Sequence, residues 1–180
     1  MKHIRRSLDK SSVKALLHAF VTSRLDYCNS LLAGQPQYQL DRLQSVLNCA
    51  ARLYANASWG SHTSTILHDD LHWLRVPERI TYKLCTLVYR CLHNDAPSYL
   101  MQYCTKLQDS SSRVSRNRSA AVGNLFVPRF RTKTFGPRSF AVSGPMSWNA
   151  LPALLKADMP FPAFKSQLKT HLFNVSYPGA

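Results

Sequence analysis

Acidic side chains are scarce in this sequence, which has 9 Asp and Glu against 23 Lys and Arg and a formal net charge of +14. Such an imbalance predicts an anionic partner, of which nucleic acid is the commonest class and a membrane surface the next. The excess is uneven, because residues 1–109 contain 13 basic and 8 acidic side chains, whereas residues 110–180 contain 10 basic and 1 acidic. The C-terminal part is therefore the expected binding region.

Long apolar runs and paired cysteines are also missing. No stretch of about 18 apolar residues occurs, so no membrane span and no membrane partner are expected. Lys14 and His18 interrupt the first apolar stretch and no small-residue cleavage site follows, which argues against a secretory signal and leaves a mitochondrial presequence as the alternative. Five cysteines without short paired spacing argue against a disulfide framework, so we expect a reducing intracellular compartment, nuclear or cytoplasmic.

Catalytic motifs are not found. Six glycines are too few for a phosphate-binding loop, and neither a nucleophile elbow nor a dinucleotide fingerprint occurs. A polymerase holds two Mg²⁺ ions with adjacent carboxylates that follow an aromatic residue in a tight hairpin, whereas Asp69-Asp70 follows Leu67-His68 in a helical context. We expect Asp69 and Asp70 to be an exposed pair near a helix start. The chain is expected to have no catalytic residues and no cofactor.

Two groups of residues resemble metal sites. His68 and His72 have the spacing of a zinc protease helix, but Asp occupies the position of the catalytic Glu and no third ligand follows. Cys85, Cys91 and His93 match no common zinc spacing, and the two cysteines lie near an apolar helical stripe. We expect buried thiols and no metal ion.

The N-terminal half has the apolar spacing of helices. A first helix is expected from Ser11 or Ser12 to about residue 33, ended by a left-handed Gly34, and Pro36 is expected to precede a second helix that extends to about Ala55. Helices joined by so short a turn are expected to form an antiparallel hairpin. After a loop, further helical segments are expected at 66–74, 77–93 and 97–104.

The C-terminal half is expected to be less regular. Residues 109–123 lack periodicity and are rich in Ser and Arg, which predicts a linker. Residues 125–127 are expected to form a short strand paired with 139–142 across a turn, followed by a helical turn around Trp148 and a helix over 160–173. The expected fold is mainly α, with a helical scaffold at 1–108, a linker at 109–123 and a small β-containing basic subdomain at 124–180.

Cations and aromatic rings alternate between residues 124 and 152, a pairing that suits a polyanion with flat bases. The candidate nucleic-acid-binding residues are Arg113, Arg116, Arg118, Arg129, Phe130, Arg131, Lys133, Arg138, Lys165 and Lys169.

Alternatives stay open for several of these residues. The three arginines of the linker form either a solvated charge run or an arm that contacts phosphates, and Lys165 and Lys169 either extend the positive face or solvate the last helix. Phe130 is expected at the surface. Four other aromatic residues are expected to anchor the loop in the core rather than stack on bases: Phe126, Phe135, Phe140 and Trp148.

Several phrases together resemble the C-terminal region of LINE-type, non-LTR retrotransposon reverse transcriptases. Among them are Ala-Phe-Val-Thr-Ser-Arg-Leu-Asp-Tyr-Cys-Asn-Ser-Leu-Leu at 19–32 and Trp-Asn-Ala-Leu-Pro at 148–152. All of the phrases occur in the same order along this chain as in those reverse transcriptases, and the others lie at 50–53, 71–74, 96–100, 127–129, 133–136 and 164–170. The resemblance covers about residues 5–173 and is specific only in combination.

The resemblance implies a position after the polymerase palm and its catalytic aspartates, comprising the thumb and the segment beyond it. Such a region is expected to bind template RNA or an RNA–DNA duplex without sequence preference. One alternative is an interaction module whose helical hairpin docks on another protein, such as a polymerase domain. A fragment with no role of its own is a further alternative.

Overall fold

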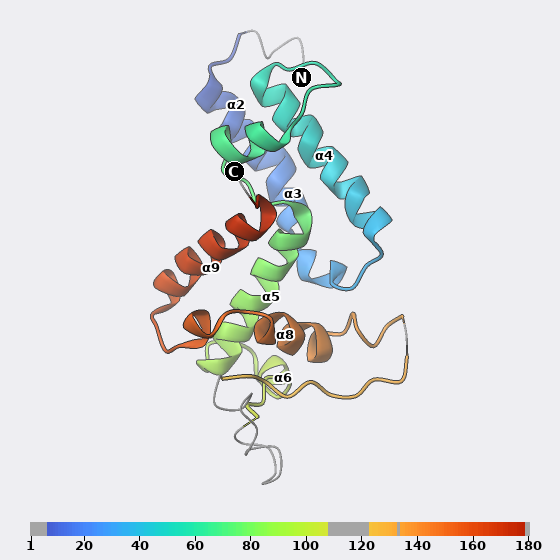
Figure 1. Cartoon of the computed structure of the whole chain (residues 1–180), viewed down its shortest axis with the longest axis vertical. Helices are drawn as coiled ribbons and strands as arrows, with labels where there is room; N and C mark the ends of the chain where they lie inside the picture. Colours follow the sequence, from blue (N-terminus) through green and yellow to red (C-terminus); the bar gives the residue numbers. More distant parts are fainter. Residues whose placement is uncertain (1–6, 108–122, 133, 179–180) are drawn as a thin grey trace. The chain divides into compact units, whose positions relative to one another are not determined.

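The computed structural model describes residues 7–107, 123–132 and 134–178 (Figure 1). Contacts divide the chain into unit 1, which comprises Met1–Asn29, Gln35–Arg79 and Leu172–Ala180, and unit 2, which comprises Ser30–Gly34 and Ile80–His171. The α-helices are α2 (Lys10–Leu17), α3 (Ser23–Asp26), α4 (Gln37–Ala55), α5 (Val76–Leu92), α6 (Ser98–Met101), α8 (Phe140–Asn149) and α9 (Phe161–Ser176). The expectation of a mainly α fold is confirmed.

Unit 1 is built on a helical hairpin. In Figure 1, α2 and α4 run in opposite directions, as expected from the short turn between them. Their apolar faces meet in one buried cluster together with four residues from later segments, Leu67, Leu71, Trp73 and Tyr177. Because Tyr177 is buried there and donates a hydrogen bond to the Trp73 carbonyl at 2.8 Å, the end of the chain belongs to this core.

The first helix is shorter and less regular than expected. Its N-cap is Asp9, which accepts hydrogen bonds from the backbone of Ser11 at 3.1 Å and Ser12 at 3.4 Å, rather than Ser11 or Ser12 itself. After α2 the chain forms a π-helical segment, His18–Thr22, where Thr22 donates its hydroxyl proton back to the His18 carbonyl. Hydroxyl bonds of this kind compete with the regular helical ladder. The helix ends at Asp26 and Cys28 has a positive φ of 51°.

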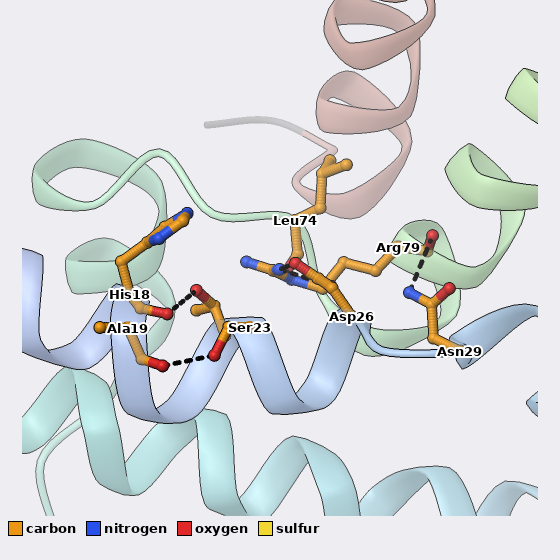
Figure 2. Close-up of polar contacts among 8 residues, drawn as sticks. His18, Ala19, Ser23, Asp26, Asn29, Leu74 and Arg79 are labelled. Atoms are coloured by element: carbon orange, nitrogen blue, oxygen red, sulfur yellow. Dashed lines mark hydrogen bonds and ion pairs between the residues drawn. The ribbon is translucent and has the colours of Figure 1, made fainter.

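An ion pair fixes the end of α3 within unit 1 (Figure 2). Arg79 Nη1 donates to both carboxylate oxygens of Asp26 at 2.8 and 2.9 Å, and its Nε donates to the Leu74 carbonyl at 2.9 Å. The Arg79 side chain is 13% exposed, so its charge depends on this partner. Asn29, which is also buried, donates to the Arg79 carbonyl at 3.5 Å. Asp26 and Asn29 therefore stabilise unit 1 through their contacts with Arg79.

Asp26→Asn is expected to lower the free energy of unfolding by about 1–3 kcal/mol, because it leaves a largely buried guanidinium without its counter-charge. Chemical denaturation measures the loss. Asp95→Asn is the matched control, since Asp95 pairs with Arg90 at 3.0 Å between side chains that are 48% and 68% exposed. An exposed pair contributes less than about 1 kcal/mol. Equal losses in the two variants would contradict this assignment.

Unit 2 has an aromatic core that links three helices. The ring of Phe164 in α9 stacks on Tyr89 of α5 with a centroid distance of 4.5 Å and lies 5.7 Å from Trp148 of α8. Tyr89 also stacks on His93 at 3.9 Å and donates its hydroxyl proton to the Met159 carbonyl. Phe164 and Trp148 are both buried. The helix expected over 160–173 is thus confirmed, and it ends slightly later, at Ser176.

The expected β-containing subdomain is not supported. Residues 140–149 form α8 instead of a strand, with Pro145 inside the helix. Leu125 makes an isolated antiparallel bridge with Lys106 rather than with 139–142, and among the described residues this is the extent of β pairing. A short apolar run such as Phe-Ala-Val has no periodicity that separates strand from helix, so the prediction of a strand there was wrong.

Unit 2 includes residues on both sides of the Ser/Arg-rich segment. Unit 2 joins most of α5 to residues beyond the Ser/Arg-rich segment, because Tyr89 of α5 packs on Phe164 of α9. The expected linker at 109–123 lies outside the described residues except for Gly123.

Candidate nucleic-acid interface

Two hydrogen bonds from one side chain hold the segment that leads into the candidate site. Asn149, at the end of α8, accepts from the Leu125 backbone N–H at 2.8 Å and donates to the Leu125 carbonyl at 2.9 Å. Leu125 is 1% exposed, so both of its backbone groups are satisfied away from water by this amide. The side chain of Asn149 thus replaces the partner strand that the sequence had suggested.

Neighbouring residues fasten the same segment, residues 123–125, which we call the stem. Trp148 Nε1 donates to the Gly123 carbonyl at 3.1 Å. Lys156 Nζ donates to Asn124 Oδ1 and to the Asn149 carbonyl, both at 2.8 Å. Burial lowers the pKa of Lys156. Its ammonium group connects the stem to the end of α8, because its acceptors are Asn124 and Asn149. Sequence reasoning missed Asn149 and Lys156, because bonds over 24 and 32 residues leave no local pattern.

Asn149→Ala is expected to lower the free energy of unfolding by about 2–3 kcal/mol, because it leaves the buried N–H and C=O of Leu125 without partners. Asn149→Asp keeps an acceptor for the Leu125 N–H but loses the donor to the Leu125 carbonyl. Its free energy of unfolding should therefore lie between those of the original chain and Asn149→Ala. The exposed Asn174→Ala serves as the control and should change stability by less than about 0.5 kcal/mol.

Trypsin provides a second measurement for the same variants. Cleavage after Arg129 and Arg131 should be faster in Asn149→Ala than in the original chain, since the released stem frees the segment that follows. Unchanged stability together with unchanged cleavage would contradict the role of Asn149 as a positioning residue.

The stem leads into residues 126–138, which we call the basic loop; its described parts, 126–132 and 134–138, are irregular. In Figure 1 it runs out from the stem and returns to the start of α8, so that both of its ends are tied to this helix. Arg129 and Arg131 are exposed, and the ring of Phe130 between them is 46% exposed. Phe135 is 71% exposed. The basic loop therefore presents guanidinium groups and ring faces to solvent together.

A tight turn shapes the basic loop. The Gly136 N–H donates to the Thr132 carbonyl at 3.3 Å, and a Cβ at Gly136 would lie 2.6 Å from that oxygen and 2.7 Å from Phe130 Cβ. Only glycine permits so close an approach. Beyond the turn, the guanidinium of the half-buried Arg138 lies over the Phe135 ring at 5.9 Å. The turn thus holds Phe130 and Phe135 near one bend of the chain.

The structure places the other candidate cations differently. Lys165 and Lys169 are exposed on α9, and Lys165 Nζ lies 5.0 Å from the Phe161 ring. These lysines thus lie on a regular helix, whereas Arg129 and Arg131 lie on the irregular basic loop. Four candidates lie outside the described residues: Arg113, Arg116, Arg118 and Lys133.

The expected core anchors are confirmed only for Trp148, which is 3% exposed. Phe140 is half-buried. Phe126 and Phe135 are exposed, so the prediction that they anchor the loop was wrong. Leu125 takes the anchoring position, and because side chains alternate in an extended segment, Phe126 points the other way.

The residues with metal-site spacing have other contacts. His72 has a positive φ of 53° and follows the π-helical segment Ile66–Asp70, so it does not continue a helix from His68. The rings of both histidines lie against Phe173, at 4.9 and 6.2 Å. Asp69 and Asp70 are exposed as expected, although they end the segment rather than begin it. Within the described ranges, no group of three or more His, Cys, Asp or Glu could hold a metal ion.

The cysteines of unit 2 are buried thiols, as expected. Cys85, Cys91 and Cys104 are buried, and burial raises the pKa of Cys85 and of Cys104 to about 12. In the unfolded chain a thiol has its ordinary pKa near 9. Stability contributed by these protonated thiols is therefore fully present below pH 9 and is lost as the pH rises from 9 toward 12.

Iodoacetamide at about pH 8 is expected to alkylate the exposed Cys28 of the folded protein and to spare Cys85 and Cys104, because the thiolate is the reacting species. Mass spectrometry of digested protein measures the modification. The urea midpoint should also fall above about pH 9, and less steeply in a Cys85→Ala, Cys104→Ala variant. Equal alkylation of the three thiols in the folded state would contradict their burial.

No helix within the described ranges has both the length and the apolar character needed to cross a bilayer. Comparison of the chain with family models, curated proteins and solved structures finds no match.

Proposed function

We propose that this chain is a non-catalytic nucleic-acid-binding region, equivalent to the segment after the polymerase in a non-LTR retrotransposon reverse transcriptase. Its ligand would be RNA or an RNA–DNA hybrid, bound without sequence preference by the basic loop in the nucleus or cytoplasm. The proposal rests on one observation: a loop whose stem is hydrogen-bonded to α8 exposes Arg129, Phe130, Arg131 and Phe135.

The charges of unit 2 support the same ligand. Its sequence contains 13 Lys and Arg against 3 Asp. Of these acids, Asp95 pairs with Arg90 at 3.0 Å and Asp158 lies 3.5 Å from His93. Among the described residues, no ion pair involves Arg129, Arg131 or Arg138. These guanidinium groups are therefore available to phosphates, and binding would release counterions from the nucleic acid.

A salt titration tests the proposal. Fluorescence anisotropy with labelled RNA and with an RNA–DNA hybrid should give affinities that fall with salt, with a slope of about −2 to −4 in a plot of log K against log salt. Such a slope corresponds to about three to five phosphate contacts. Binding that is absent, or that does not change between low and high salt, would refute the proposal.

A second function is favoured by the surface of unit 1. Large apolar side chains are exposed on the first helical segments and on α4: Leu16, Phe20, Tyr27, Tyr38 and Val46. We propose as the alternative that this hairpin docks on the polymerase domain that would precede it in the proteins it resembles. Exposed apolar residues of this size favour a protein partner over a purely solvated helix.

Size-exclusion chromatography tests the docking alternative. The chain alone should self-associate through this surface, and adding the polymerase palm domain should replace the self-association with a mixed complex. Phe20→Ser and Val46→Ser should abolish both effects. A chain that stays monomeric and does not bind the palm domain would refute docking. The proposal that the basic loop binds RNA would still stand.

A further inference from the structure

Three phenylalanines of the basic loop are exposed although nearby apolar side chains are buried, and two of them, Phe130 and Phe135, lie at the Gly136 turn. Phe130 is 46% exposed and Phe135 is 71% exposed, whereas Leu125 and Trp148 are almost completely buried. Exposure of a ring has a cost in water. The Gly136 backbone packs against Cβ and Cδ2 of Phe130, so the turn fixes the position of this partly exposed ring. The fold of the loop thus determines the position of these exposed rings.

Each ring is accompanied by cations. Arg129 and Arg131 flank Phe130 in sequence and are exposed, and the guanidinium of Arg138 lies 5.9 Å from the centroid of Phe135. A cation beside an exposed ring offers a phosphate contact next to a flat apolar surface. A nucleic-acid strand alternates phosphates and bases, as the loop alternates cations and rings. The loop is therefore complementary to a strand whose bases are unpaired.

We infer that Phe130 and Phe135 stack on unpaired bases, so that the basic loop selects single-stranded RNA over duplexes. This inference rests on the proposed function and narrows its ligand. In a duplex each base is covered on both faces by its neighbours, and a protein ring can stack only on a base that is unpaired or splayed out. Cations alone would bind both forms, since both carry phosphates.

Competition experiments with the full chain test the inference without any variant. The labelled probe is an oligouridine of about 20 nucleotides, enough to span one binding segment. The competitors are unlabelled oligouridine, an abasic oligonucleotide of the same length, and an RNA duplex with the same number of phosphates. Oligouridine should compete at least about tenfold more strongly than either of the other two, since stacking contributes about 1–3 kcal/mol per base.

Variants assign the preference to the rings. Phe130→Leu with Phe135→Leu keeps every charge and should weaken oligouridine binding about tenfold or more, while affinity for the abasic strand and the salt slope stay unchanged. Phe20→Leu is the matched control, because it makes the same substitution at a ring that is 61% exposed in unit 1. That control should bind like the original chain.

Four outcomes separate the possibilities. The inference is supported if the chain prefers oligouridine tenfold over the abasic strand and the duplex, and if the double variant loses this preference. Salt-dependent binding of all three competitors with equal strength overturns it and leaves the proposed function standing. Absence of salt-dependent binding to every nucleic acid overturns both. Binding to vesicles of anionic phospholipid that depends on Phe130 and Phe135, without selectivity among nucleic acids, overturns the inference in favour of a membrane surface.

Discussion

Replacing Arg129, Arg131 and Lys133 with alanine is expected to weaken RNA binding about 100-fold near physiological salt and to reduce the salt slope by about 2. Each lost phosphate contact removes about 0.7 from the slope for a single strand, and three contacts remove about three times as much. Arg129 and Arg131 are exposed, and among the described residues they have no acidic partner that would compete with a phosphate. Anisotropy titrations at several salt concentrations measure both quantities.

A control variant of equal charge distinguishes a site from general attraction. Arg24, Arg42 and Lys83 are exposed on α3, α4 and α5, and replacing them with alanine removes the same charge from regular helices. This variant should lose less than about threefold in affinity, because the contacts to phosphates remain. If the two triple variants weaken binding equally, the net charge of the chain and not the basic loop determines affinity.

Phe164→Ala is expected to lower the free energy of unfolding by about 3–5 kcal/mol, the largest loss in stability predicted for this chain. Phe164 is fully buried, with its ring stacked on Tyr89 at 4.5 Å and packed near Trp148 at 5.7 Å. Removing the ring leaves a cavity among the three helices of unit 2 and weakens the support of Trp148, which bonds the stem through Gly123. Chemical denaturation measures the loss.

Two further variants make the test of Phe164 quantitative. Phe164→Leu fills most of the cavity and should lose about half as much stability as Phe164→Ala. Phe135→Ala removes a ring that is 71% exposed and should change stability by less than about 0.5 kcal/mol. If Phe164→Ala proved no more destabilising than Phe135→Ala, the aromatic stack would not be the core of unit 2.

The regular helices could be predicted because their apolar spacing matches their burial. The helix expected over 37–55 occurs as Gln37–Ala55, and its apolar stripe places Leu47, Ala50 and Tyr54 in the core. Gly34 has the expected positive φ of 66°. In α9 the same rule places Phe164 and Leu168 inside. The helical spacing of apolar residues is enough to predict a helix that buries one face.

The strand pairing could not be predicted because side chains replaced it. The partner of the Leu125 backbone is the side-chain amide of Asn149, and the neighbouring backbone groups of Asn124 and Phe126 bond to Leu107 and Thr105, all distant in sequence. Likewise, nothing near Asp26 in the sequence indicates that its partner is Arg79, 53 residues later. Tertiary contacts of single polar groups carry no periodicity, so only the folded chain displays them.

The candidate site could be predicted in its composition but not in its geometry. Alternation of Arg and Phe indicated the basic loop, whereas the exposure of Phe126 and Phe135 depends on how the loop turns. Gly136 decides this turn through the close approach of Thr132 and Phe130, a contact that its sequence neighbours do not suggest. Lys165 and Lys169 were grouped with the site by charge, and they lie on α9 rather than on the basic loop.

Photo-cross-linking tests most directly whether the basic loop is the nucleic-acid-binding site. The full chain is irradiated with RNA that contains 4-thiouridine, and the cross-linked peptides are identified by mass spectrometry at low and at high salt. We expect cross-links within residues 126–138, concentrated at Phe130 and Phe135 and lost at high salt. Cross-links confined to the helices of unit 1, or none at low salt, would contradict the assignment of RNA binding to this loop.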